Sequence, residues 1–171
     1  MEFIPDEKDE GLTVPYYEDA SNALGVVGYA TNRSEKELRV EIERAMAHLG
    51  ASIQSFQSGR FGPETGPYRY GYVITFRWQG VDGRIVVAGL PIRNETPSRI
   101  EKTKRHALYS VMLKLESQFN SQLVMPGDFP LVPYLLNDKG QSLMEAIAQS
   151  SNFPALPEPK GDIEEGEWRE A

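Results

Sequence analysis

Residues 68–90, YRYGYVITFRWQGVDGRIVVAGL, decide the fold of this chain. Over 68–78, aromatic and branched side chains fall on one face, and Arg, Gly, Val and Thr fall on the other. This alternation is the two-residue period of a half-buried β-strand. The Gly-containing stretch 79–83 predicts a hairpin turn, most simply with Asp82 and Gly83 at its centre.

Two further strands are predicted beside this one. Residues 84–90 form the return strand, which Pro91 ends because proline lacks the N–H that a central strand needs. Residues 51–58 show a weaker alternation and predict a short strand. Three Gly and two Pro then make 59–67 a loop. The predicted sheet therefore has three antiparallel strands.

Two amphipathic helices flank this sheet in the sequence. Ser34 and Glu37 form a capping box, and the apolar spacing that follows predicts a helix ending at Gly50. Ser98 is the expected N-cap of a second helix that runs to about Leu123. Strands grouped between helices indicate an α+β fold. We expect a helix, a three-stranded antiparallel sheet and a helix, with both helices on one face of the sheet.

The chain divides into one domain and two acidic ends. Its 171 residues suit a single domain with tails. We expect an acidic mobile arm over 1–20, one α+β domain over 21–150 and an acidic disordered tail over 151–171. Inside the domain, an irregular Leu- and Pro-containing segment over 124–141 leads to a short C-terminal helix at 142–149.

Charge is distributed unevenly along the chain. The whole chain has 25 acidic and 18 basic residues and a net charge of −7, which by itself disfavours a nucleic-acid partner. Residues 1–10 and 158–171 each carry −4, which leaves +1 for 11–157. Residues 58–114 carry ten cations against four anions, or +6. A basic centre between acidic ends points to an anionic partner or an interaction tail.

The composition argues against several classes of protein. There is no Cys and there are only two His, so we expect no disulfide, no metal site and no His-based relay. No phosphate loop or metal-binding carboxylate set appears, so we expect neither an enzyme nor a cofactor. No apolar run approaches about 18 residues and the N-terminus is acidic, so we expect no membrane span and a cytoplasmic location.

The predicted hairpin places three arginines on one face of the sheet. Antiparallel pairing aligns Arg84 with Arg69 and Arg77 because side chains alternate with a strict period of two. If the helices cover the aromatic face, the arginine face is open, and guanidinium groups bind phosphate well. The alternative is an ordinary solvated face. Should the aromatic face be open instead, Tyr70 or Trp78 would stack on bases.

A second group of cations lies at the start of the second helix, at Arg99, Lys102, Lys104 and Arg105. Cations at a helix N-terminus are disfavoured by a few tenths to about 1 kcal/mol each, because the helix dipole is positive there. A bound external anion would neutralise them. The alternative is a basic surface helix balanced by neighbouring glutamates.

This arrangement resembles the double-stranded-RNA-binding-domain fold, in which a basic helix start grips phosphates. Single-strand annealing proteins of homologous recombination share the same α-β-β-β-α core. The segments RWQGVDGRIVVAGLPI (77–92) and KTKRHALYSVMLKLESQF (102–119) also resemble an uncharacterised family of phage and mobile-element proteins. The resemblance covers about 34–150. It implies phosphate binding by the two cation groups, single-stranded DNA rather than RNA, strand annealing and a homo-oligomer.

The end of the chain, GDIEEGEWREA, resembles the acidic tails of phage and bacterial single-stranded-DNA-binding proteins. Glu164, Glu165 and Glu167 surround Trp168 there. The resemblance implies that this tail competes with DNA or recruits a protein partner. The alternative is a solubilising tail.

The leading hypothesis is therefore a non-enzymatic DNA-binding protein of recombination or replication. The competing hypothesis is a protein-interaction adaptor that binds a partner through its acidic tail or through the Leu- and Pro-containing segment 124–136.

Overall fold

The polypeptide forms a helix, an antiparallel sheet and two further helices along the chain, as the sequence predicted. The computed structural model describes residues 14–62, 68–125 and 127–150. The strand order in the sheet is β1-β2-β3. The elements are η1 (Tyr17–Asp19), η2 (Asn22–Leu24), α1 (Glu35–His48), β1 (Ala51–Phe61), β2 (Arg69–Trp78), β3 (Val81–Ala88), α2 (Pro97–Val124), η3 (Val132–Tyr134) and α3 (Leu143–Ser150).

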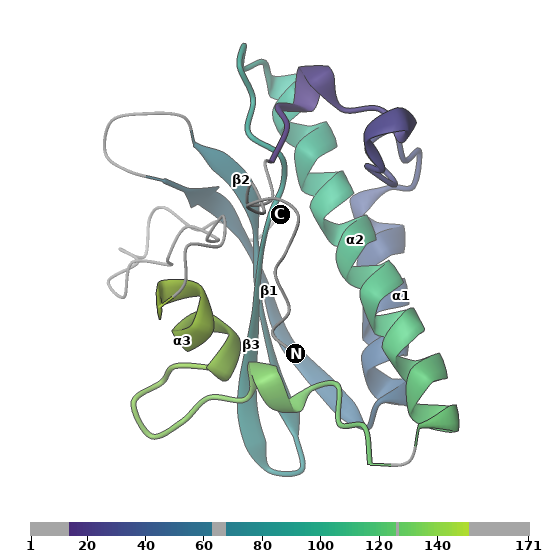
Figure 1. Ribbon diagram of the computed structural model, residues 1–171, viewed down its shortest axis with the longest axis vertical. Helices are drawn as coiled ribbons and strands as arrows, with labels where there is room; N and C mark the ends of the chain where they lie inside the picture. Colours follow the sequence, from purple (N-terminus) through teal and green to yellow (C-terminus); the bar gives the residue numbers. More distant parts are fainter. Residues whose placement is uncertain (1–13, 63–67, 126, 151–171) are drawn as a thin grey trace, which may run out of the picture.

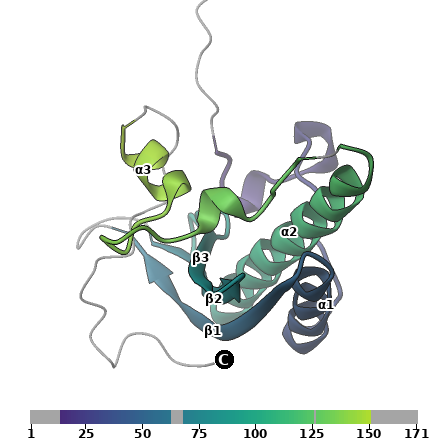
Figure 2. The ribbon, with the colours of Figure 1, turned by 90° about the horizontal axis from the view of Figure 1, so that it is seen from below.

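The sheet separates two layers of unequal size. Figure 1 shows it nearly edge-on, with α1 and α2 on one side and the shorter α3 on the other. Figure 2 shows α1 and α2 side by side along the sheet. The predicted α+β class is confirmed, and both main helices cover the same face. One end of the domain, upper in Figure 1, holds the start of α2 and the ends of β1 and β3.

The core lies between the aromatic face of the sheet and the two helices. Side chains that alternate along β2 are fully buried there, because the apolar stripes of α1 and α2 pack onto them. The predicted helix stripes and the predicted sheet face therefore meet as expected. The residues with no exposed surface in this cluster are Leu38, Ile42, Met46, Tyr72, Ile74, Phe76 and Leu108.

The β2–β3 hairpin turns three residues earlier than the sequence suggested. Gln79 and Gly80 form a two-residue turn, with φ of 48° and 76°, so the predicted Asp82–Gly83 centre is wrong. Gly83 instead lies in β3 opposite Phe76. A Cβ on Gly83 would lie 2.2 Å from the ring Cζ of Phe76, so glycine serves packing at this position.

Strand β1 is longer than predicted. It continues through 59–61, which were expected to belong to a loop, and Phe61 pairs with Arg69. A register irregularity between Ile53 and Ser55 interrupts the alternation along this strand. Hydrogen bonding to β2 therefore defines β1 more strongly than its own side-chain pattern does.

The two helix starts differ in how well the sequence located them. The capping box of Ser34 and Glu37 is present as predicted. Helix α2 starts earlier than expected, because Thr96 is its N-cap and Pro97 is its first residue. Proline suits that position because its missing N–H would have had no partner in the helix.

The chain before α1 is attached to the loop that precedes α2. The Tyr17 amide donates to the Pro91 carbonyl at 2.8 Å, and Glu18 and Asp19 contact residues 93–99. Residues 17–19 were expected to belong to the mobile arm over 1–20, but these contacts attach them to the domain. Residues 1–13 and the predicted acidic tail over 151–171, with Glu164, Glu165, Glu167 and Trp168, lie outside the described residues.

Candidate nucleic-acid interface

The three sheet arginines share one face, as the β2–β3 register requires, but each has an intramolecular partner. Arg77 Nε donates to Asp82 Oδ1 at 3.0 Å, and both side chains are about half exposed. Arg69 donates to the carbonyls of Gly89 at 2.9 Å and Ala88 at 3.3 Å, and burial lowers its pKa. Arg69 therefore ties the start of β2 to the chain leaving β3.

Arg84 connects β3 to α3. Two of its nitrogens donate to the two carboxylate oxygens of Glu145 at 2.8 and 2.9 Å, and one of them also donates to the Gly140 carbonyl. Burial opposes ionisation of Glu145, but hydrogen bonds from Arg84 and Ser142 outweigh it and lower the pKa of that carboxyl. This bidentate pair places α3 over a part of the sheet face that was expected to be open. Val73, on the same face, is buried as well.

The two aromatic residues considered for base stacking are bound within the fold. The Tyr70 hydroxyl donates to Glu95 at 2.9 Å, and burial together with this hydrogen bond raises the pKa of Tyr70 to about 12. Trp78 Nε1 donates to the Leu49 carbonyl at 3.2 Å, and its ring meets Phe129 edge-on at a centroid distance of 6.3 Å. Stacking was expected only if the aromatic face were open, and the helices cover that face.

At the start of α2, Arg99 differs from the three cations that follow it. Its Nη1 donates to the Asn94 carbonyl at 2.7 Å and to Glu18 at 3.2 Å. Lys102 is exposed. None of Lys102, Lys104 and Arg105 forms an ion pair in the part of the chain that the structure describes.

Lys104 and Arg105 are partly buried without a carboxylate partner among the described residues. Lys104 Nζ donates to Ser58 Oγ at 3.0 Å, and burial lowers its pKa although Glu35 acts in the opposite direction. Arg105 Nε is buried and has no hydrogen-bond partner there. With Lys102, these cations are the sixth, eighth and ninth residues of α2, whose first turn has no acidic residue and whose fifth residue is the exposed Glu101. The three cations Lys102, Lys104 and Arg105 are called the helix-start group below.

Arg60 is a further cation at this end of the domain, and the sequence did not indicate it as a site residue. It is exposed and lies two residues after Ser58, on the same face of β1 as the hydroxyl that Lys104 contacts. Its guanidinium lies 4.5 Å from the ring centroid of Tyr68. The alternation Ser58–Arg60 would have indicated this position, but the predicted strand ended before Arg60.

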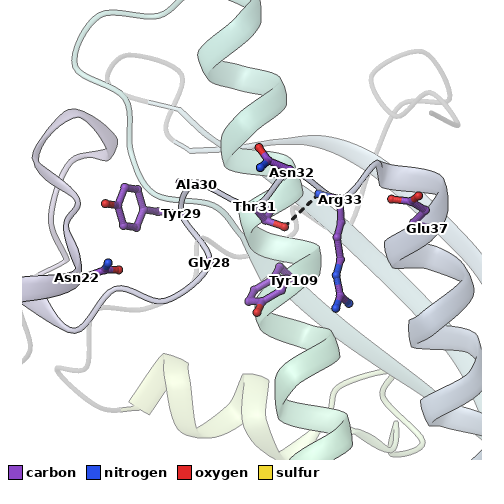
Figure 3. A pocket seen from close by; sticks show the side chains of 9 residues that line it. All are labelled: Asn22, Gly28, Tyr29, Ala30, Thr31, Asn32, Arg33, Glu37 and Tyr109. Atoms are coloured by element: carbon purple, nitrogen blue, oxygen red, sulfur yellow. Dashed lines mark hydrogen bonds between the residues drawn. The ribbon is translucent and has the colours of Figure 1, made fainter.

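A shallow cavity of about 520 Å³ lies on the outer side of α2 (Figure 3). Asn22 and Tyr29 lie on one side of it, and Arg33 and Tyr109 lie on the other. The Arg33 guanidinium is already paired with Glu41 and lies 5.8 Å from the Tyr109 ring centroid. The cavity therefore adds no unpaired cation to the helix-start group.

His106 of α2 is buried. Its Nε2 donates to the Val27 carbonyl at 2.9 Å, and its Nδ1 is buried without a partner among the described residues. Burial lowers the pKa of His106. The residue therefore anchors the chain before α1 to α2 as a neutral ring at pH 7.

Neither a metal site nor a membrane span is found among the described residues. Within 14–62, 68–125 and 127–150, no group of three or more His, Cys, Asp or Glu side chains is placed to hold a metal ion. None of the helices described there combines the length and apolar character needed to cross a bilayer.

Comparison of the chain with protein-family models, with curated proteins and with solved structures finds no match.

Proposed function

We propose that this protein binds nucleic acid, single-stranded DNA foremost, through the first turns of α2. The observation that carries the proposal is the contrast between two sets of cations. On the sheet, Arg77 and Arg84 pair with carboxylates and Arg69 donates to two backbone carbonyls. The helix-start group forms no ion pair among the described residues, and its one side-chain hydrogen bond there runs from Lys104 to the Ser58 hydroxyl. Lys102, Lys104 and Arg105 lie beyond the first turn of α2, so their own positive charge, rather than the helix dipole, would attract an external anion.

The chemistry of the group suits a phosphate backbone. Lysine and arginine bind phosphate oxygens through charge-assisted hydrogen bonds, and backbone binding requires no base contact. Arg60 extends the group along β1, so the proposed surface spans the start of α2 and the end of β1 (Figure 1). The resemblance to annealing proteins favours single-stranded DNA over RNA, and it also suggests strand annealing and a homo-oligomer.

The test is a salt titration of binding to a fluorescent oligothymidine of about 20 nucleotides. Three phosphate contacts on a single strand predict that log affinity falls against log salt with a slope of about −2. Lys102→Gln should weaken binding several-fold and reduce the slope by about 0.7. Competition with duplex DNA and with RNA of the same length ranks the possible substrates.

Two matched variants decide where the binding surface lies. Lys139→Gln removes an exposed lysine in the turn before α3 and changes the net charge by the same amount as Lys102→Gln. Arg77→Gln removes a paired arginine of the sheet face. Both should leave affinity and slope unchanged. If Arg77→Gln weakens binding and Lys102→Gln does not, the binding surface lies on the sheet. If the wild type does not bind the oligonucleotide at about 50 mM salt, the proposed function is wrong.

A second candidate function is a protein-interaction adaptor, and a specific feature favours it. Five exposed apolar residues fall within the ten positions 123–132, where α2 ends. This stretch lies at the opposite end of α2 from the helix-start group (Figure 1). A group of exposed apolar residues typically marks an interaction surface. The five residues, which are between 44% and 77% exposed, are Leu123, Val124, Met125, Phe129 and Val132.

The adaptor is tested at the most exposed of these positions. A photo-crosslinker at position 124 identifies a partner, and binding is then measured with purified components. An adaptor predicts that Val124→Glu abolishes this binding and that Lys102→Gln leaves it intact. The reverse pattern contradicts the adaptor. Sedimentation velocity of wild type and Val124→Glu tests whether the proposed homo-oligomer uses the same surface.

A further inference from the structure

The loop before α2 forms a receptor for an anion, and a carboxylate of the chain itself occupies it. Glu18 Oε1 accepts a hydrogen bond from the Asn94 amide at 2.9 Å, and Glu18 Oε2 accepts one from the Arg93 amide at 3.1 Å. The Arg99 guanidinium donates to Oε1 at 3.2 Å. Two backbone amides and one guanidinium therefore converge on a single carboxylate.

The carboxylate is held firmly in this receptor. The Asn94 amide is the largest influence that lowers the pKa of Glu18, to about 2, and the Arg93 amide and Arg99 act in the same direction. The Glu18 side chain is only 15% exposed. The Glu18 carboxylate is therefore charged at every physiological pH. Whether it stays in the receptor depends on the contacts that the neighbouring residues make.

Neighbouring residues attach the segment through contacts of their own. The Tyr17 amide donates to the Pro91 carbonyl, and Asp19 pairs with Arg93 at 2.6 Å. The Arg93 guanidinium also lies 4.7 Å from the ring centroid of Tyr16. Most of these contacts are polar and lie at the surface, so salt and competing anions weaken them.

The receptor adjoins the helix-start group. Arg99 precedes Lys102 by three residues on α2, so the two side chains lie on the same side of the helix, one turn apart. The donors that hold Glu18 are of the kind that binds phosphate in other proteins, because backbone amides and guanidinium groups donate to both carboxylate and phosphate oxygens. A nucleic-acid strand bound to Lys102 would reach this receptor if it continued by one helical turn toward the N-terminus of α2.

We propose that Glu18 occupies a phosphate subsite of the nucleic-acid surface and that the segment 16–19 thereby limits binding. Release of the segment exposes the Arg93 and Asn94 amides and the Arg99 guanidinium to a backbone phosphate. The inference rests on the proposed function for its biological role, whereas the receptor itself rests on the geometry of Glu18. An oxyanion and Glu18 compete for the same donors.

The first test is Glu18→Gln in the full-length chain. Glutamine keeps the size of the side chain but removes the charge that competes with phosphate. The variant should bind the oligothymidine several-fold more tightly, and its salt slope should be steeper by about 0.7 because Arg99 adds one phosphate contact. Glu43→Gln is the matched control, because Glu43 is exposed on α1, forms no ion pair among the described residues and changes the net charge equally.

A second variant separates release of Arg99 from a general charge effect. Adding Arg99→Gln to Glu18→Gln should return the slope to its wild-type value. If the gain persists in the double variant, or if Glu43→Gln produces the same gain, the inference is wrong. Equal binding by wild type and Glu18→Gln also overturns it and leaves the proposed function standing.

The receptor is tested without nucleic acid by titration with inorganic phosphate. In Glu18→Gln, phosphate should shift the amide NMR signals of Arg93 and Asn94, and in the wild type it should not. Absence of the shift in the variant refutes the anion receptor. If neither the wild type nor any variant binds the oligonucleotide, the proposed function and the inhibitory role of the segment are both wrong, and the phosphate titration still decides whether the receptor exists.

Discussion

The substitution Gly83→Ala probes the packing that sets the hairpin register. The added Cβ would lie 2.2, 2.5 and 2.7 Å from Cζ, Cε2 and Cε1 of the Phe76 ring. The ring has no exposed surface, so it cannot move into solvent to avoid the contact. Overpacking of a core typically costs about 1–3 kcal/mol. We expect a loss of about 2 kcal/mol, which lowers Tm by about 4–8 °C in a chain of this size.

The partner of this clash is identified by a double-mutant cycle measured by urea denaturation. Leucine lacks the ring atoms that the new Cβ would meet, so Gly83→Ala should cost little in a Phe76→Leu background. The expected coupling is about 1–2 kcal/mol, well above the additivity error of about 0.5 kcal/mol. Equal costs in the two backgrounds would refute the assignment of Gly83 to a packing role.

Gly80 supplies the control for backbone effects. Its φ of 76° is left-handed, and a Cβ added there would meet no atom of the described residues within 4 Å, so Gly80→Ala should lose only backbone energy. That loss is roughly 1–2 kcal/mol and should not depend on residue 76. If Gly83→Ala behaved like Gly80→Ala in both backgrounds, a turn centred on Asp82–Gly83 would fit better.

Three further predictions concern elements attached around the sheet. Glu145→Gln weakens the pair with Arg84, so α3 should lose roughly 1–2 kcal/mol of local stability. The amides of α3 should then exchange faster in the variant than in the wild type, whereas those of α1 should not change. Burial lowers the pKa of His106 below the value of about 6.5 in the unfolded chain, so the unfolded chain binds a proton first as pH falls, and stability decreases. Tm should therefore fall between about pH 7.5 and 5.5, and His106→Gln should flatten this dependence. Gly28→Ala places a Cβ 2.1 Å from the Tyr109 ring, so amides of 22–31 should lose exchange protection while the sheet keeps it.

The sequence predicted the helices and the central strands well because their signals are local. The capping box at Ser34 and Glu37 and the alternation along 68–78 involve residues a few positions apart. The end of β1 was missed because the Gly and Pro residues of 59–67 indicated a loop, whereas pairing with β2 extends the strand through 59–61. The turn was displaced because a glycine required by the Phe76 ring resembles a glycine required by a turn.

The candidate site could be predicted only in part. The clustering of cations in 58–114 was visible in the sequence, and the shared face of the three sheet arginines followed from the two-residue period. Which cations remain unpaired was not visible. Arg84 pairs with a glutamate 61 residues away, and Arg99 pairs with one 81 residues away.

Short-range patterns in the sequence therefore establish the α+β order of elements, the buried faces of helices and strands, and the basic character of the middle of the chain. Which of those basic residues have a partner depends on the packing of segments that are distant in the sequence. The physical reason is that hydrophobic periodicity is a property of neighbouring residues, whereas charge compensation depends on which distant segments the fold brings within about 4 Å of each other.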